Sequence, residues 1–92
     1  MLVSRSEERL RASEAEVKQA HPTVQTQIVQ ADFASDTSLG FYERIVEQTK
    51  GKDVSILVNN AGLTLVGNVE WTTCEEQKSL VDTNLTAVTM LT

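Results

Sequence analysis

The chain has 92 residues, a formal net charge of −5, 40% hydrophobic and 23% charged residues, and a single cysteine. This length and composition allow one small globular domain. The scattered basic residues argue against a nucleic-acid partner, no apolar run approaches the roughly 20 residues of a membrane span, and one cysteine excludes an internal disulfide or cysteine zinc site, so no metal site is expected.

The first third of the chain predicts a strand, a helix and a second strand. Leu2–Arg5 has the composition of the tail of a strand. Ser6 is a favourable N-cap for a helix that should run to about Ala20. Pro22 ends that helix, because proline disfavours helical backbone in the residue before it. Val24 to Ala31 is rich in β-forming residues and is the second predicted strand.

The middle of the chain predicts another helix and a third strand. Ser35 or Asp36 can cap the helix, and Gly51 is its expected stop. One helical face is indicated by residues at the appropriate spacing, namely Leu39, Tyr42, Val46 and Thr49. Val54 to Asn59 is the most uniformly apolar of the three predicted strands, which predicts burial on both faces, as in a parallel sheet.

The last third predicts a loop followed by a helix. The loop covers Gly62 to Glu70, with a turn at Gly67-Asn68. Two overlapping capping boxes, Thr72 with Glu75 and Thr73 with Glu76, then start a helix that reaches the last residue without a stop signal. Because the chain also begins inside a predicted strand, we expect truncation at both termini.

The order β-α-β-α-β-α predicts a parallel sheet with right-handed crossovers. Ligands of such sheets bind beyond the carboxyl ends of the strands. Those ends carry Ser4-Arg5, Asp32-Phe33 and Asn59-Asn60-Ala61-Gly62. We therefore expect these three polar clusters to share one edge of the sheet.

Taken together, these strand ends resemble the short-chain dehydrogenase/reductase family over essentially the whole chain. Asn59-Asn60-Ala61-Gly62 is similar to its NNAG motif, Asp32 to the aspartate that meets the adenine amino group, and Asp82–Thr86 to the segment that holds its helix asparagine, here Asn84. The resemblance implies an α/β fold with part of a Rossmann-like, doubly wound parallel sheet: strands 2 to 4, without the first strand and the C-terminal half. Residues 1–92 would be a fragment of one NAD(P)-binding domain.

Arg5 bears on the choice of coenzyme. In dinucleotide-binding folds the end of the second strand carries an acid for a ribose diol or a cation for a 2′-phosphate. Here it carries Ser4-Arg5, with no acid before Glu7. An arginine fork suits a phosphate, which favours NADP over NAD as the cofactor. The alternative is that Arg5 is only a solvated residue at the start of a helix.

The resemblance gives the other residues roles in the same site. Asp32 and the backbone of Phe33 would lie at the adenine, and Asn59 to Gly62 along the adenosine ribose, where the small Ala61 and Gly62 let the backbone approach. The main chain of Asn84 would kink its helix and hold a water of the proton relay. Alternatively, the asparagines only end a strand, Asp32 only leads into a helix, and the ring of Phe33 lies in the core.

Two motifs of the family are missing from these 92 residues: the glycine-rich TGxxxGxG turn and the YxxxK pair, since Tyr42 is followed four residues later by Val46. The chain therefore lacks a pyrophosphate cradle and a general acid. We expect a fragment of an NADP-dependent oxidoreductase, inactive as it stands, whose parent moves hydride between nicotinamide and a small-molecule carbonyl or alcohol. The alternative is a truncated, non-catalytic nucleotide- or partner-binding protein.

Within the family, Leu2–Arg5, Asp32–Ala34 and Ile56–Gly62 most resemble the hydroxysteroid dehydrogenase/3-oxoacyl-CoA reductase branch. This resemblance suggests a steroid or 3-oxoacyl-CoA substrate and a homo-oligomeric parent, cytoplasmic or associated with the endoplasmic reticulum. The family's sheet order places its first strand between the second and fourth. Without that strand, we expect the third strand here to lack a neighbour and the isolated chain to be marginally stable.

Overall fold

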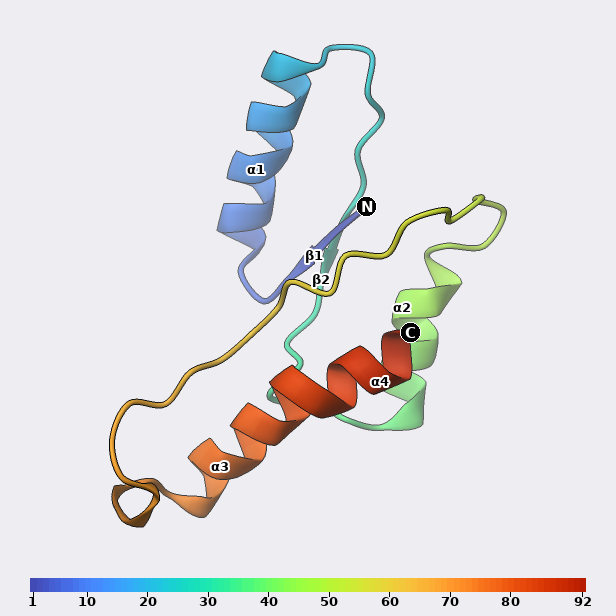
Figure 1. Ribbon diagram of the computed structural model, residues 1–92. Coiled ribbons are helices and arrows are strands. Elements are labelled where there is room, and N and C mark those ends of the chain that lie inside the picture. The colour runs from blue at the N-terminus through green and yellow to red at the C-terminus, as the bar shows by residue number, and fades with distance from the viewer. The chain divides into compact units, whose positions relative to one another are not determined.

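A computed structural model describes residues 1–92, which fall into two compact units, Met1–Asp32 and Phe33–Thr92. The first unit contains β1 (Leu2–Ser4), α1 (Glu7–Ala20) and β2 (Ile28–Gln30) (Figure 1). The second contains α2 (Leu39–Glu47), a 3-10 turn (Val69–Trp71), α3 (Cys74–Val81), a π-helical turn (Asp82–Thr86) and α4 (Ala87–Leu91). None of these helices is long and apolar enough to cross a membrane.

The first unit is the β-α-β unit that the sequence predicts. β1 and β2 are parallel, with Leu2 opposite Ile28 and Ser4 opposite Gln30. Helix α1 packs against both strands and buries Leu10, which is 4% exposed. β2 is shorter than the predicted strand from Val24 to Ala31, because its partner β1 has only three residues to pair with.

The ends of α1 follow the predicted local signals. The Ser6 hydroxyl accepts a hydrogen bond from the backbone N–H of Arg9, 3.3 Å away, and His21 is the C-cap after the last helical residue, Ala20. Further along, the Thr26 hydroxyl donates to the Glu14 carboxylate over 2.6 Å. That hydrogen bond, together with the ion pair to Lys18, lowers the pKa of Glu14 below its usual 4.5. The side chain thus ties α1 to the segment that leads into β2.

Helix α2 is capped by Ser38, so the prediction of Ser35 or Asp36 as the cap is wrong. The Asp36 carboxylate instead accepts from the backbone N–H of Ser38 at 2.9 Å, which forms a turn before the helix. The Ser38 hydroxyl then accepts from the N–H of Phe41. Beyond the helix, Gly51 has a φ of +74°, a left-handed conformation that suits glycine and matches its predicted role as a stop.

An aromatic cluster forms the core of the second unit. The ring of Phe41 meets Phe33 edge-to-face at 6.0 Å and Tyr42 at 5.1 Å. The other buried apolar side chains of this unit are Ile45 and Ala87. The predicted stripe was correct for Tyr42 but wrong for Leu39 and Val46, which are 67% and 51% exposed. The helix turns its two aromatic residues inward, because large rings bury the most apolar area.

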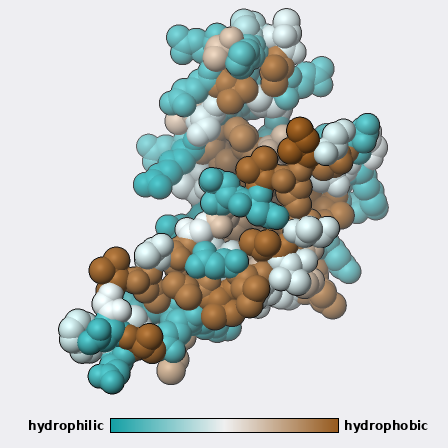
Figure 2. All heavy atoms as spheres, in the orientation of Figure 1, coloured by the Kyte–Doolittle hydropathy of each residue, from teal (hydrophilic) through white to brown (hydrophobic).

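The predicted third strand, Val54 to Asn59, is wrong. From Asp53 to Val66 the chain forms neither helix nor strand, and it runs as an irregular segment in Figure 1. Ile56 and Val58 are 81% and 76% exposed, and Figure 2 shows brown, hydrophobic side chains on the surface of the molecule. A strand needs a neighbour for its N–H and C=O groups, and the sheet consists of β1 and β2 alone.

The helical segment after Cys74 begins at one of the two predicted capping boxes. The Thr73 hydroxyl accepts from the N–H of Glu76, whose carboxylate accepts from the N–H of Thr73. The box of Thr72 with Glu75 does not form. The Thr72 hydroxyl donates to the carbonyl of Val69 and accepts from Gln77, so it belongs to the preceding 3-10 turn.

We expect Thr73→Ala to destabilise α3 by about 1 kcal/mol, the usual cost of losing a hydroxyl cap. Thr73→Ser keeps the acceptor oxygen and should cost only a few tenths of a kcal/mol. Urea unfolding followed by far-ultraviolet circular dichroism measures both. Equal losses in the two variants would show that the methyl group, not the hydroxyl, stabilises this end of the helix.

Candidate functional site

Two of the three predicted polar clusters meet at one edge of the β1–β2 sheet. The last ladder bond joins the N–H of Ala31 to the carbonyl of Ser4 at 3.0 Å. Arg5 and Asp32 each follow directly, at the carboxyl ends of parallel strands. The sheet therefore brings a cation and a carboxylate residue to the same edge, where α/β sheets bind ligands.

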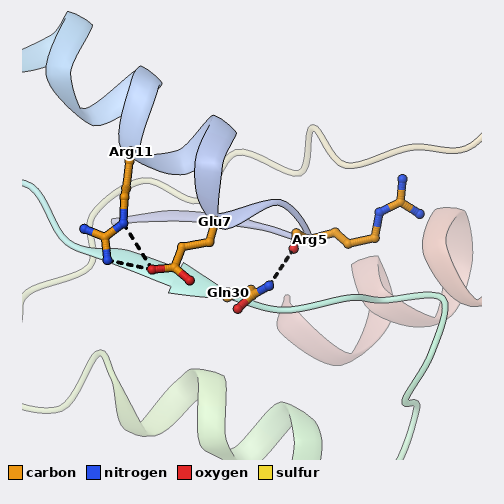
Figure 3. A network of polar contacts seen from close by, with 4 residues as sticks. All are labelled: Arg5, Glu7, Arg11 and Gln30. Atoms are coloured by element: carbon orange, nitrogen blue, oxygen red, sulfur yellow. Dashed lines mark hydrogen bonds and ion pairs between the residues drawn. The ribbon is translucent and has the colours of Figure 1, made fainter.

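The Arg5 guanidinium is exposed and has no ion-pair partner. Glu7, the nearest acid in the sequence, is bound instead to Arg11, whose Nε and second terminal nitrogen lie 3.1 and 2.6 Å from one carboxylate oxygen. Figure 3 shows the Arg5 side chain extending away from this pair. A cation with unused donors is available at the sheet edge for an anionic ligand.

Phe33 opens the second unit, and its ring lies in the core against Phe41, 8% exposed. This confirms the core alternative for the ring. Its predicted contribution, a backbone amide beside Asp32, stays a prediction.

The Asn59-Asn60-Ala61-Gly62 segment lies in the second unit and is exposed along its whole length. The side-chain amide of Asn59 donates to the Thr92 hydroxyl at 3.1 Å. A Cβ built on Gly62 would meet Asn84 Oδ1 at 3.5 Å, an ordinary van der Waals distance. The protein's own packing therefore leaves room for a Cβ at position 62.

Asn84 anchors the segment just after this motif. Its Oδ1 accepts from the N–H of Leu63 at 2.8 Å, and its Nδ2 donates to the Leu63 carbonyl at 2.7 Å. Asn84 lies in the π-helical turn, where the N–H of Ala87 donates to the carbonyl of Asp82, five residues back. The helix is irregular at Asn84, and the side chain is used to hold the loop.

Sequence reasoning missed this side-chain role and the buried carboxylate beside it. Asp82 is 7% exposed and pairs with Lys78 one helical turn earlier. The i, i+4 spacing of Lys78 and Asp82 was the available signal for that pair. No comparable signal exists for Asn84 and Leu63, because the partner is main chain and any residue type supplies it.

Tyr42 carries a further polar group that is buried in this unit, besides Asp82 and Thr83. Its hydroxyl has no hydrogen-bond partner, and the residue is 2% exposed. Burial raises the pKa of Tyr42 above its usual 10.0, and the negative charges of Asp82 and then Asp36 raise it further. The phenol therefore stays neutral well into the alkaline range.

Since Tyr42 is the only tyrosine, absorbance at 295 nm reports its ionisation alone. We expect a midpoint above 10 in the native chain and a return to about 10 in concentrated urea. Because the folded-state pKa is the higher one, the stability linked to this group is fully present below pH 10 and falls as the pH rises through the folded-state pKa. A native midpoint at or below 10 would show that the hydroxyl is solvated.

A family model described as "short chain dehydrogenase" matches residues 1–92. The 17-beta-hydroxysteroid dehydrogenase type 3 of Rattus norvegicus is 32% identical over 94 residues, which cover 100% of this chain and 29% of that protein. The very-long-chain 3-oxoacyl-CoA reductase of Coccidioides immitis is 39% identical over 64 residues, 70% of this chain and 18% of that protein. The inactive hydroxysteroid dehydrogenase-like protein 1 of Homo sapiens is 33% identical over 93 residues, 99% of this chain and 27% of that protein.

A solved structure from a study of 7beta-hydroxysteroid dehydrogenase stereoselectivity is also similar, with a TM-score of 0.84 and 26% identity. It is matched over 97% of this chain and 34% of its own length. The chain thus spans about a third or less of the length of these relatives.

Proposed function

Because this chain belongs to the short-chain dehydrogenase family, we propose that it forms the adenosine-binding part of an NADP-dependent oxidoreductase. Such an enzyme transfers hydride between the nicotinamide of its coenzyme and the carbonyl or alcohol carbon of a small-molecule substrate. The observation that carries the choice of NADP is the unpaired guanidinium of Arg5 at the carboxyl edge of the β1–β2 sheet.

The donor set at this edge fits the adenosine end of the coenzyme. A 2′-phosphate presents oxygens that a guanidinium fork binds with two parallel N–H donors. Asp32, two residues beyond the end of β2, would accept from the adenine amino group. An acid at the Arg5 position would instead suit the two ribose hydroxyls of NAD, and the acid nearest to Arg5 in the sequence, Glu7, is already bound to Arg11.

For the second unit, taken by itself, we propose two roles in the complete enzyme. The exposed backbone from Asn59 to Gly62 would lie along the adenosine ribose, and the Asn84–Leu63 hydrogen bonds would keep the end of this segment in place. We assign to the Asn84 main chain the binding of a water in the proton relay of the complete enzyme. The irregular helix at this residue supports that role, because a π-helical turn alters the usual backbone hydrogen bonds.

The relatives suggest the substrate class of such an enzyme. Three of the four carry hydroxysteroid in their name or title, one of them as an inactive dehydrogenase-like protein, and one is named for very-long-chain 3-oxoacyl-CoA. We propose a bulky apolar carbonyl compound of one of these two kinds for the complete enzyme. The 92 residues themselves, without a YxxxK pair, would bind the adenosine end without turning a substrate over.

A second candidate is a non-catalytic nucleotide-binding protein. The relative named inactive is 33% identical to this chain, the same level as the 17-beta-hydroxysteroid dehydrogenase at 32%. Identity alone therefore does not separate an active parent from an inactive one. Sequencing the transcript on both sides of these codons does: an open frame that continues through TGxxxGxG and YxxxK supports the oxidoreductase, and a frame without them supports the non-catalytic protein.

Adenosine 2′,5′-bisphosphate and AMP differ only in the 2′-phosphate and therefore test the proposed coenzyme directly. We expect the chain to bind the bisphosphate roughly 10- to 100-fold more tightly, the value of one or two hydrogen bonds to a charged group. Calorimetric titration with each nucleotide measures the ratio. Equal affinities, or tighter binding of AMP, would contradict the assignment of NADP.

A further inference from the structure

Gln30, the last residue of β2, reaches across the sheet to the main chain of Arg5. Its side-chain Nε2 donates to the Arg5 carbonyl at 3.0 Å (Figure 3). In the strand register Gln30 lies opposite Ser4. The side chain therefore contacts the residue one position beyond its own partner, after the backbone ladder has ended.

This hydrogen bond fixes the backbone of Arg5, which lies between β1 and α1 and is part of neither. Ser4 is fixed by its ladder bond from Ala31, and Ser6 is fixed as the cap of α1. Arg5 lies between them and belongs to neither the strand nor the helix. With the Gln30 bond, the backbone of Arg5 is held on both sides and at its own carbonyl.

The Arg5 guanidinium has no ion-pair partner, although the Arg5 backbone is fixed. The Glu7–Arg11 pair uses the closest carboxylate in the sequence, so the guanidinium is not drawn down onto α1. A cation whose backbone is fixed and whose donors are unused loses less freedom when it binds an anion. The arrangement prepares Arg5 for a ligand outside the chain.

We propose that Gln30 is a positioning residue that sets the affinity of Arg5 for the 2′-phosphate, and so contributes to coenzyme preference through Arg5. This inference rests on the proposed function and adds a residue that does not touch the coenzyme. Both Gln30 and Arg5 are exposed, so water can replace the lost hydrogen bond in a variant and global stability should change little. We expect the substitution of Gln30 to change the ratio of the affinities for 2′-phosphorylated and unphosphorylated nucleotides instead.

The test compares Gln30→Met, which keeps the side-chain length and removes the donor, with the wild-type chain. We expect about a 3- to 10-fold weaker affinity for adenosine 2′,5′-bisphosphate, the value of one neutral hydrogen bond, and an unchanged affinity for AMP. Gln19→Met, an exposed glutamine on α1, is the matched control and should change neither. Weakening of both nucleotides to the same extent would show a merely structural role and overturn the proposal.

A double-mutant cycle separates this inference from the proposed function. In an Arg5→Met background, Gln30→Met should have no further effect on the ratio of the two affinities, since it acts only through Arg5. An additive effect there overturns the inference. If Arg5→Met alone leaves the ratio unchanged, the proposed function fails and the inference falls with it. If Arg5→Met removes the preference and Gln30→Met keeps it, only the role of Gln30 is wrong.

Should Gln30→Met lose the helical circular dichroism of the wild-type chain, Gln30→Glu serves as the second variant. It keeps the shape of the side chain, removes the donor and places a carboxylate near the same carbonyl. We expect a larger loss of bisphosphate affinity than for Gln30→Met, because the added charge also repels the phosphate. An unchanged ratio in this folded variant would overturn the role of Gln30.

Discussion

Arg5→Asp should abolish the preference for a 2′-phosphorylated nucleotide and turn it toward AMP. The substitution removes the guanidinium donors and places a carboxylate at the edge where the phosphate would bind. We expect the affinity for adenosine 2′,5′-bisphosphate to fall by roughly 10- to 100-fold or more, from the lost charged hydrogen bonds and the new repulsion. The affinity for AMP should hold or improve, because a carboxylate accepts from both ribose hydroxyls.

Arg9→Asp is the control for this experiment, since it makes the same change of charge at an exposed residue of α1 rather than at the strand end. We expect it to weaken the bisphosphate only slightly, through a screened long-range interaction. A similar loss in both variants would mean that net charge, rather than the position of Arg5, determines the preference.

Phe41→Ala should unfold the second unit. The substitution deletes the ring that contacts both Phe33 and Tyr42, and a buried Phe→Ala change costs about 3–5 kcal/mol. A small unit has few other buried apolar side chains to compensate, and whole domains are stable by only about 5–15 kcal/mol. We expect the near-ultraviolet circular dichroism to be lost and the Tyr42 absorbance midpoint to fall to about 10.

Leu39→Ala in the same helix gives the matched control. Leu39 is 67% exposed, and exposed substitutions of this kind usually change stability by less than 0.5 kcal/mol. If Leu39→Ala were as damaging as Phe41→Ala, the face of α2 given by Leu39, Tyr42 and Val46 would be the buried one after all. Denaturant titration of both variants decides between the two faces.

The features predicted correctly from the sequence are those that depend on neighbouring residues. The caps at Ser6 and Thr73 and the glycine stop at Gly51 each rest on a side chain and a backbone group within a few residues. Their physics is contained in the local sequence. The predicted cap of α2 was wrong for a local reason too, because the Asp36 carboxylate accepts from the N–H of Ser38, before the helix begins.

The third strand could not be predicted in this way. The apolar run from Val54 to Val58 has strong β propensity, but a strand exists only when another strand satisfies its backbone. Whether that partner is present is a property of the whole sheet, and here the sheet has two strands. Local preference was therefore overruled by the absence of pairing.

The candidate site was predicted in part for the same reason. Arg5 and Asp32 lie at one sheet edge, as expected, because parallel pairing of β1 and β2 brings their carboxyl ends together. The hydrogen bonds of Asn84 to Leu63 and of Gln30 to Arg5 were not predicted. In both, a side-chain amide binds a main-chain group. Main-chain groups are the same for nearly every residue type, so the residue type of the partner gives no signal.

The irregular segment from Asp53 to Val66 also determines where a protease would act first on this molecule. Exposed backbone without regular hydrogen bonds is a preferred site of proteolytic cleavage. Cleavage there would cut the chain between α2 and α4 but would leave the two helices in contact, because they pack together. A digested sample should therefore show two bands on a denaturing gel while the helices remain folded and associated.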